Sequence, residues 1–262
     1  MSDSKSTTII IGLGEIGKPL FNLIAKAENE KTIGIDIQPI EISESVGIMH
    51  ICIPFQLENG FVKTVTEYAK KYKPEIVVVN STVTPGTSKS IEMSSSIPTV
   101  YSPVRGKHAR METELLLYTK FIAGTNKEAV KIVDKHFKHV GMKTKIISNP
   151  SALELSKLLE TTYFGLLVSW AQEMDRFAKQ VNGEYSEITP FFEEISYLPP
   201  VIFQPGFIGG HCIMQNIKLL KSQLTSEYLD TIEHSNEKKA TELSGDEGKL
   251  KQRIEPIKIN RL

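Results

Sequence analysis

Cys212 is a candidate nucleophile because of its setting in the sequence. It closes the stretch GFIGGHC, which begins at Gly206, and a helix is predicted from Ile213 to about Leu224. A helix N-terminus favours thiolate over thiol, which makes a cysteine nucleophilic near neutral pH. An inert small residue beside a glycine turn explains the same spacing, so the sequence alone leaves both interpretations open.

A polar stripe lies on a long predicted helix. Glu154, Lys157 and Thr161 follow one another at spacings of three and four residues, which places them on one helix face. A lysine on such a face could stabilise a developing oxyanion or transfer a proton. The alternative is an ion pair between Glu154 and Lys157 at a solvated helix start, and spacing alone favours it.

A basic loop supplies the third set of candidates. Arg105, Lys107 and His108 follow a predicted strand, and cationic groups at that end of a sheet suit an anionic substrate. Ordinary surface charge explains them equally well. His136 and His139 lie on another predicted helix without an apparent third metal ligand, which indicates a solvated helix face.

The elements that position these groups begin with a nucleotide-binding pattern near the amino terminus. An apolar strand leads into Gly12, Gly14 and Gly17, which open a helix, and Asp36 ends the next short strand. The glycines allow a tight turn, the approach of a pyrophosphate and close packing of helix on strand. Asp36 can accept hydrogen bonds from a ribose 2′-hydroxyl and repels a 2′-phosphate, so the pattern predicts NAD. A glycine-rich turn in another α/β protein is the alternative.

The order of the remaining elements indicates the fold class. Strands are predicted at Ile33–Ile35, Ile48–Ile53, Glu75–Val79, Thr99–Ser102, Lys120–Ala123 and Lys145–Ile147. Strands that alternate with helices predict an α/β fold with a doubly wound, mostly parallel Rossmann sheet. Ligands bind such sheets at the carboxyl ends of the strands, where the polar turn after Val79 lies.

The pattern changes at Ser151. From there to about Asn182 no proline interrupts a helical pattern, and its middle, YFGLLVSWA, is apolar on nearly every face. A helix that is apolar all round must be buried all round, and this chain offers little material to cover it. We therefore expect a helical dimerisation segment that buries Leu166, Leu167 and Trp170 or their neighbours against a partner subunit.

The sequence thus predicts three regions. Residues 1–148 form the NAD-binding Rossmann domain, and residues 149–234 form a helical dimerisation and active-site domain. After His234 the sequence is charged, with few apolar anchors. Residues 235–262 are therefore predicted to be a mobile tail, or a segment that orders on a partner.

Composition limits the functional classes. The 31 basic and 31 acidic residues give no formal net charge, so no electrostatic footprint for nucleic acid or an anionic membrane is visible. The polar start lacks the apolar core of a signal peptide, and no apolar run is long enough for a membrane span. Cys52 and Cys212 form no disulfide framework. We expect a soluble cytoplasmic protein.

Several segments together resemble the UDP-glucose/GDP-mannose dehydrogenase family. The similarity runs from about Thr7 to Asn216 and includes ICIPF, NSTVTPGT, ELSK, QEMDRFA and PGFIGGHC. The last of these is close to the cysteine loop of the UDP-N-acetylmannosamine dehydrogenase branch and is the most specific. Too few residues follow Cys212 for the family's carboxyl-terminal nucleotide-sugar domain, so we expect that domain to be lacking.

The resemblance implies a mechanism. Family members oxidise a sugar hydroxymethyl group twice with two NAD, through a thiohemiacetal and a thioester on the cysteine, and water then hydrolyses the thioester. Cys212 matches the nucleophile, Lys157 the oxyanion-stabilising lysine, and Thr82 an active-site threonine. The implied cofactor contacts are Gly12, Leu13, Gly14, Glu15, Ile16, Gly17, Asp36, Pro54, Ser81 and Thr82. The implied substrate contacts are Arg105, Lys107, His108, Glu154 and His211.

Three site positions depart from the family pattern. Thr161 stands in place of an asparagine, Asn216 in place of an aspartate, and Val104 in place of a glutamate. The leading hypothesis is an NAD-dependent dehydrogenase that acts on a small polar or anionic alcohol or aldehyde. The alternative is a non-catalytic NAD-binding sensor or partner protein, which the three altered positions favour.

Overall fold

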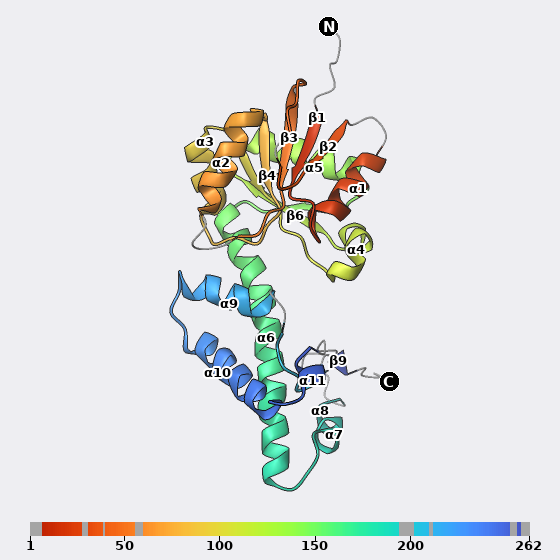
Figure 1. Ribbon diagram of the computed structural model, residues 1–262, viewed down its shortest axis with the longest axis vertical. Helices are drawn as coiled ribbons and strands as arrows, with labels where there is room; N and C mark the ends of the chain where they lie inside the picture. Colours follow the sequence, from red (N-terminus) through yellow and green to blue (C-terminus); the bar gives the residue numbers. More distant parts are fainter. Residues whose placement is uncertain are drawn as a thin grey trace. The chain divides into compact units, whose positions relative to one another are not determined.

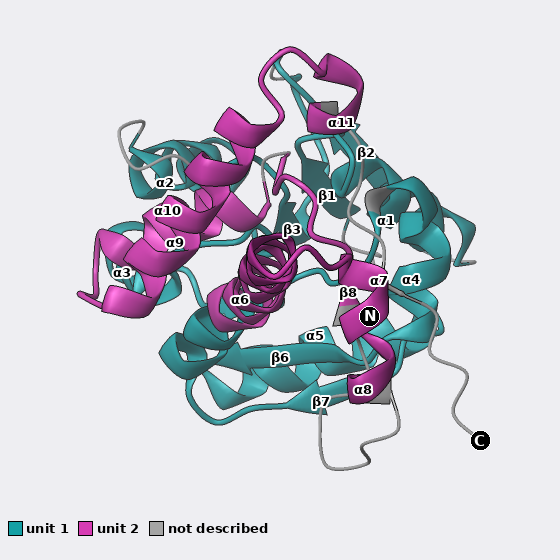
Figure 2. Ribbon diagram, turned by 90° about the horizontal axis from the view of Figure 1, so that it is seen from below, with its two compact units in different colours: residues 1–157 teal, residues 158–262 magenta. Residues whose placement is uncertain are grey.

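The structure, a computed structural model, describes residues 7–27, 31–38, 40–55, 60–193, 202–209, 212–251 and 256–257. Two compact units divide the chain at residues 157 and 158, and Figure 2 colours them separately. The sequence predicts this boundary nine residues earlier, after residue 148. It lies later because the start of the long helix, at Leu153 and Glu154, is buried in the first unit.

Unit 1 is built on one seven-stranded sheet. Its strands are β1 (Thr7–Ile11), β2 (Thr32–Ile35), β3 (Val46–Ile51), β4 (Ile76–Val79), β5 (Thr99–Tyr101), β6 (Lys120–Gly124) and β7 (Thr144–Ile146). The spatial order is β2-β1-β3-β4-β5-β6-β7, and every neighbouring pair is parallel except β5 and β6. The predicted doubly wound, mostly parallel α/β sheet is confirmed.

Helices cover both faces of this sheet (Figure 1). They are α1 (Gly17–Lys26), α2 (Phe61–Tyr72), α3 (Thr87–Ser95), α4 (Met111–Leu117) and α5 (Lys127–His139). Because successive side chains of a strand point to opposite faces, Ile9 and Ile11 join the core beneath α2 and α3, whereas Ile10 joins the core beneath α1, α4 and α5. Burial on both faces explains why the central strands are continuous apolar runs.

A close backbone approach fixes the connection from β1 to α1. Gly12 has a φ of +89°, in the left-handed region that glycine adopts readily. A Cβ added to Gly17 would lie 1.7 Å from the carbonyl oxygen of Gly12, so only glycine permits this packing. A Cβ on Gly14 would meet nothing within 4 Å, which leaves the backbone open to a ligand at this turn.

Unit 2 is mainly helical. Its elements are the greater part of α6 (Pro150–Gln180), α7 (Tyr185–Ile188), α8 (Pro190–Glu193), β8 (Ile202–Phe203), α9 (Ile213–Lys221), α10 (Glu227–Glu242), α11 (Glu247–Lys251) and β9 (Pro256–Ile257). The long helix predicted from Ser151 is present as α6. The tail predicted from residue 235 is wrong for residues 235–242, because α10 runs to Glu242 and buries Asn236 and Lys239. The buried side chains of α10 are largely polar, so the sequence shows no apolar periodicity that would predict this helix.

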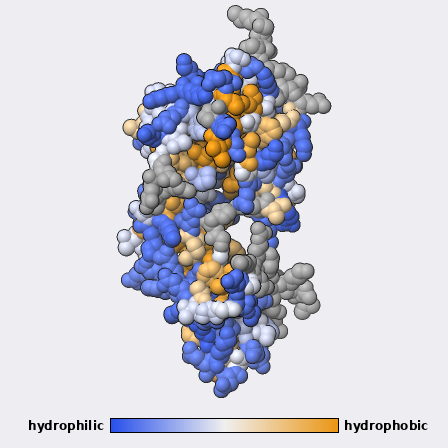
Figure 3. Space-filling view, viewed as in Figure 1, coloured by the Kyte–Doolittle hydropathy of each residue, from blue (hydrophilic) through white to orange (hydrophobic). Residues whose placement is uncertain are grey.

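One face of α6 in unit 2 stays open to solvent. Tyr163, Trp170 and Phe177 expose 51%, 54% and 52% of their surface, and their seven-residue spacing places them along one side of the helix. Val168 and Ala171 are buried on the other side. Apolar side chains reach the visible surface of unit 2 among hydrophilic ones (Figure 3).

No helix in the described ranges combines the length and apolarity needed to cross a membrane.

Candidate functional site

The switch point of the sheet lies between β1 and β3. From β1 the chain passes to β2 on one side, and it returns to β3 on the other. Doubly wound sheets bind ligands at this point, beyond the carboxyl ends of the strands. The glycine turn follows β1 here, and Cys52 follows β3. The amide of Cys52 donates to the carbonyl oxygen of Ile11 at 2.8 Å, which joins the two turns.

Asp36 and the start of α1 complete this edge. Asp36 is exposed at the end of β2, and its Oδ1 accepts a hydrogen bond from the amide of Leu13 at 3.4 Å. The carboxylate therefore lies beside the glycine turn. α1 begins without a side-chain cap at Ile16 and without an acidic residue in its first turn. Its positive dipole end is thus suited to a phosphate group.

The turn after β4 is tied to the turn after β3. The Ser81 hydroxyl donates to the carbonyl oxygen of Ile53 at 2.6 Å and is buried. Thr82 beside it is half-buried, and Pro54 is exposed. The structure therefore brings Ser81, Thr82 and Pro54 to the same edge of the sheet as the glycine turn.

Glu154 has a role different from the expected substrate contact. Its side chain is fully buried. Oε2 accepts from the amide of Gly86 at 2.6 Å, and Oε1 accepts from the Ser88 amide at 2.8 Å and from the Ser88 hydroxyl. Burial raises the pKa of this carboxyl group. Glu154 therefore caps the N-terminus of α3, and its oxygens are directed at the chain itself.

The basic loop is only partly available to a ligand. The Arg105 guanidinium donates to the carbonyl oxygen of Thr119 at 3.0 Å, and its carbon lies 4.8 Å from the ring centre of Phe121. The guanidinium is thus held against β6. Lys107 is exposed. His108 opens a short 3-10 helix, His108–Arg110, and its side chain lies outside the described residues.

Lys120 is a buried cation that the sequence did not single out. Its Nζ donates to Asn80 Oδ1 at 3.1 Å and to the carbonyl oxygens of Ser102 and Pro103 at 2.5 and 3.2 Å. Because β6 is antiparallel to β5, its first residue lies at the carboxyl edge of the sheet. Burial lowers the pKa of Lys120 to about 7. A lone lysine before an apolar run looks like surface charge, and only the strand order reveals its position.

A hydrogen-bond chain continues from Lys120 through the sheet. Because Asn80 Oδ1 accepts from the lysine, its Nδ2 faces His50 Nδ1 at 3.2 Å. Neutral His50 then carries its proton on Nε2, which lies 3.1 Å from His136 Nε2. Burial holds the pKa of His50 well below its usual range. The expectation of a solvated face is therefore wrong for His136, which is 5% exposed.

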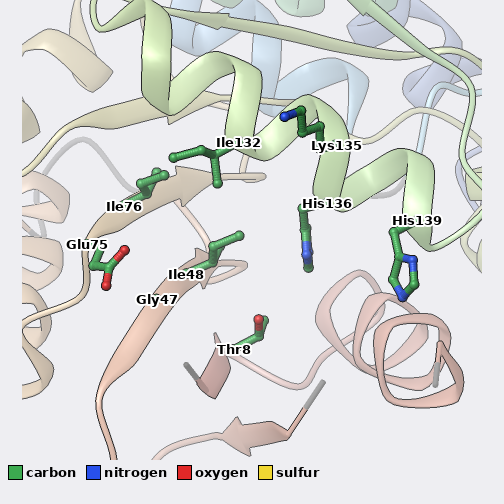
Figure 4. Close-up of a pocket in the computed structure, with 9 residues that line it drawn as sticks. All are labelled: Thr8, Gly47, Ile48, Glu75, Ile76, Ile132, Lys135, His136 and His139. Carbon is green, nitrogen blue, oxygen red and sulfur yellow. The ribbon is translucent and has the colours of Figure 1, made fainter. Parts of the chain in front are cut away.

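His136 also lines a pocket at the opposite edge of the sheet (Figure 4). The pocket has a volume of about 320 Å³ and is lined by Thr8, Gly47, Ile48, Glu75, Ile76, Ile132, Lys135, His136 and His139. The strand residues in this lining lie near the amino ends of β1, β3 and β4. The pocket is therefore distinct from the switch-point edge. Within the described residues, no group of three or more histidine, cysteine or acidic side chains could bind a metal ion.

Unit 2 contains the cysteine and the two altered family positions. Cys212 is exposed and occupies the N-cap of α9, which agrees with the helix start expected after it. The amide of Asn216, one turn later, donates to the carbonyl oxygen of Cys212 at 3.2 Å. Asn216 Nδ2 donates to Thr161 Oγ1 at 2.8 Å. The two substituted residues thus form a neutral hydrogen-bonded pair, while His211 lies outside the described residues.

The buried lysine predicts a pH dependence that Lys120→Met should remove. The pKa of Lys120 falls from 10.5 to about 7 on burial, so the unfolded chain binds more protons than the folded chain between these values. The stability of the native protein should therefore rise with pH relative to the variant, by up to about 1.4 kcal/mol per pH unit. Urea unfolding of both proteins between about pH 7 and 9.5 measures this difference. A difference that stays constant with pH would contradict the burial of this amine.

Comparisons with known proteins agree with the sequence resemblance. Residues 151–238 match the central-domain model of the UDP-glucose/GDP-mannose dehydrogenase family. The chain is 24% identical over 211 residues to the UDP-N-acetyl-D-mannosamine dehydrogenase of Methanococcus maripaludis, with 74% of this chain and 48% of that protein covered. It is 22% identical over 214 residues to the enzyme of the same name from Methanocaldococcus jannaschii, with 75% and 48% covered. The chain spans about half the length of these curated relatives.

Solved structures share the fold. The UDP-D-ManNAc dehydrogenase of Pyrococcus horikoshii has a TM-score of 0.79 at 18% identity, over 91% of this chain and 70% of that one. The 3-hydroxyisobutyrate dehydrogenase of Mycobacterium tuberculosis has a TM-score of 0.66 at 12% identity, over 92% and 94%. The resemblance seen in the sequence motifs is thereby confirmed, and residues 151–238 match the central domain of the UDP-glucose/GDP-mannose dehydrogenase family.

Proposed function

We propose that the chain is an NAD-dependent oxidoreductase resembling nucleotide-sugar 6-dehydrogenases, which oxidises a hydroxyl or aldehyde group of a small polar or anionic substrate. The observation that carries the proposal is the exposed thiol of Cys212 at the N-cap of α9. A helix N-terminus stabilises a thiolate, and exposure makes it accessible. The names of the relatives, UDP-N-acetyl-D-mannosamine dehydrogenases, support a sugar derivative as substrate.

In this proposal Cys212 forms the covalent bond to the substrate. Its Sγ attacks an aldehyde carbon, the carbonyl oxygen takes up a proton, and a thiohemiacetal results. When bound, NAD would supply the hydride acceptor. Lys157, half-buried on α6, offers a positive charge for the developing oxyanion. The thiohemiacetal carbon would lose a hydride to this acceptor and its hydroxyl group would lose a proton, which would leave a thioester. Water would then hydrolyse the thioester to release the acid and the thiol.

The residues of the switch-point edge fit an NAD molecule. Gly14 leaves open space for a pyrophosphate beside the uncapped start of α1. Asp36 lies next to Leu13, where a ribose would follow the pyrophosphate. These residues would hold the dinucleotide and orient it along the carboxyl ends of β1 and β3.

Asp36 should make the protein select NAD over NADP. A carboxylate repels a 2′-phosphate and accepts hydrogen bonds from a 2′-hydroxyl, so NAD should bind at least about tenfold more tightly. Titration calorimetry with both cofactors measures the ratio, and Asp36→Ser should reduce it without loss of thermal stability because the side chain is exposed. Equal or tighter binding of NADP by the native protein would refute the assignment.

A non-catalytic NAD-binding protein is the second candidate. The observation that favours it is the neutral pair of Thr161 and Asn216, which stands where the resemblance implies an asparagine and an aspartate. Without a carboxylate one turn after Cys212, a possible base for thioester hydrolysis is absent from that position. A sensor or partner protein would keep NAD binding at the switch-point edge of unit 1 and would not catalyse a reaction.

We also propose that the exposed face of α6 pairs with a second copy of this chain. Tyr163, Trp170 and Phe177 form an apolar stripe, with Leu166 and Leu167 half-buried beside it. Exposed aromatic residues on one helix face are typical of a protein–protein interface. In a two-fold pair, the stripe of each copy would be buried against the stripe of the other copy.

Trp170→Glu should convert this dimer to a monomer. A charge at the centre of an apolar interface must be desolvated on association, which typically costs several kcal/mol. Light scattering at micromolar protein should give the mass of two chains for the native protein and of one for the variant. Tyr228→Glu is the matched control, because Tyr228 is also an exposed aromatic of unit 2, at 72%, but lies on α10. A native protein that is monomeric under these conditions would refute the dimer.

The reactivity of Cys212 separates the enzyme from the sensor. Burial raises the pKa of the Cys52 thiol to about 12, so iodoacetamide should label Cys212 first, and faster than a free model thiol at pH 7. Cys212→Ser should abolish turnover through a thiohemiacetal and leave NAD affinity nearly unchanged, since the residue does not hold the cofactor. Labelling no faster than the model thiol would favour the sensor.

A further inference from the structure

The segment that leads to Cys212 is shaped by tight turns. The amide of Gly206 donates to the carbonyl oxygen of Gln204 at 2.8 Å, and the amide of Gly209 donates to that of Phe207 at 3.0 Å. Each bond spans two residues, which gives narrow turns with little stability of their own. This segment, residues 204–209, is called the cysteine loop below. Its shape must therefore be stabilised by side chains from other elements.

Asn236 of α10 holds the middle of the cysteine loop. Its Oδ1 accepts from the amide of Ile208 at 2.7 Å, and its Nδ2 donates to the carbonyl oxygen of the same residue at 3.1 Å. Because a backbone amide only donates and a carbonyl only accepts, these two bonds fix the orientation of the side-chain amide. Asn236 is 4% exposed and Ile208 is 1% exposed. One buried side chain thus satisfies both backbone groups of one loop residue.

Gln172 of α6 holds the start of the same loop. Its Nε2 donates to the carbonyl oxygen of Gly206 at 2.7 Å, and lies 3.4 Å from Asn236 Oδ1. Its Oε1 accepts from the Ser235 hydroxyl at 2.8 Å. Gln172 is fully buried. The two amide side chains, from two different helices, therefore act on the loop as one connected group.

An arginine fixes the two helices that carry these amides. Arg176 of α6 donates from Nη1 to the Ser235 hydroxyl at 3.1 Å and from Nη2 to the Ser235 carbonyl oxygen at 2.9 Å. Its Nε donates to Glu242 Oε1 at 2.6 Å. Hydrogen bonds to charged groups are stronger than neutral ones. These bonds hold α6 and α10 together, so the side-chain amides of Gln172 and Asn236 keep fixed positions beside the loop.

We propose that Asn236 and Gln172 are positioning residues for Cys212: they hold the cysteine loop so that the thiol stays at the N-cap of α9. The inference rests on the proposed function where it makes that thiol the nucleophile. Ile208 in the loop is buried, and Cys212, four residues later in the sequence, is exposed. A nucleophile needs a fixed geometry, and a loop without supporting contacts does not supply it.

Asn236→Ala tests the proposal with two readouts that need no turnover. The Ile208 amide should exchange with solvent about tenfold faster, since its acceptor is lost. Iodoacetamide should label Cys212 at least about threefold more slowly at pH 7, with the rate profile displaced to higher pH, because a thiol that leaves the helix N-terminus forms less thiolate. Glu237→Ala is the matched control, since Glu237 is the exposed neighbour on the same helix.

Gln172→Met is the second variant, and it is needed if Asn236→Ala unfolds unit 2. Methionine has a side-chain volume similar to that of glutamine. The substitution removes the hydrogen bonds of Gln172 to Gly206, Ser235 and Asn236 but keeps the two bonds from Asn236 to Ile208. It should therefore slow labelling of Cys212 while the circular dichroism spectrum stays native. Folded variants of both kinds that label like the native protein would overturn the proposal. If they label slowly while the native protein shows no turnover on any sugar nucleotide, the positioning role stands and the enzymatic function fails.

Discussion

The first unit depends on the close approach of three backbone segments at the switch point of the sheet. A Cβ on Gly17 would overlap the carbonyl group of Gly12, and a Cβ on Gly12 would lie 3.0 Å from the backbone of Cys52. This packing sets α1 against β1 and joins the turn after β3 to the glycine turn. It also directs the start of α1 beyond the strand ends, where phosphate groups can reach its amides. The fold and the proposed cofactor site therefore share one constraint.

Within each unit, buried polar groups hold irregular segments in place. Glu154 caps α3, Lys120 joins the ends of β4 and β5, and Asn236 satisfies the backbone of the cysteine loop. Each side chain forms hydrogen bonds with backbone groups of an irregular segment, which lack partners in the segment itself. A buried polar group without a hydrogen bond would reduce stability by about 1–3 kcal/mol. Loops at a functional edge are thus fixed by single side chains from distant parts of the chain.

This arrangement also explains how the site can differ from the family pattern without loss of the fold. Thr161 and Asn216 satisfy each other as neutral groups, so the change of two side chains leaves no buried charge without a partner. The proposed cofactor-binding edge of unit 1 is built from other residues. The fold can therefore be kept while the reactive side chains change, so similarity to this family supports the fold more directly than it supports the reaction.

The sequence by itself determined the elements whose signals are local. The apolar strands, the glycine turn with Asp36, the long helix and the helix start after Cys212 could all be read from residue types and spacing. Only the tertiary structure decided which polar residues are buried. The sequence predicts a substrate contact for Glu154 and a tail for residues 235–242, and it does not single out Lys120. Each of these residues or segments has partners far away in the sequence, and a local pattern carries no information about such partners.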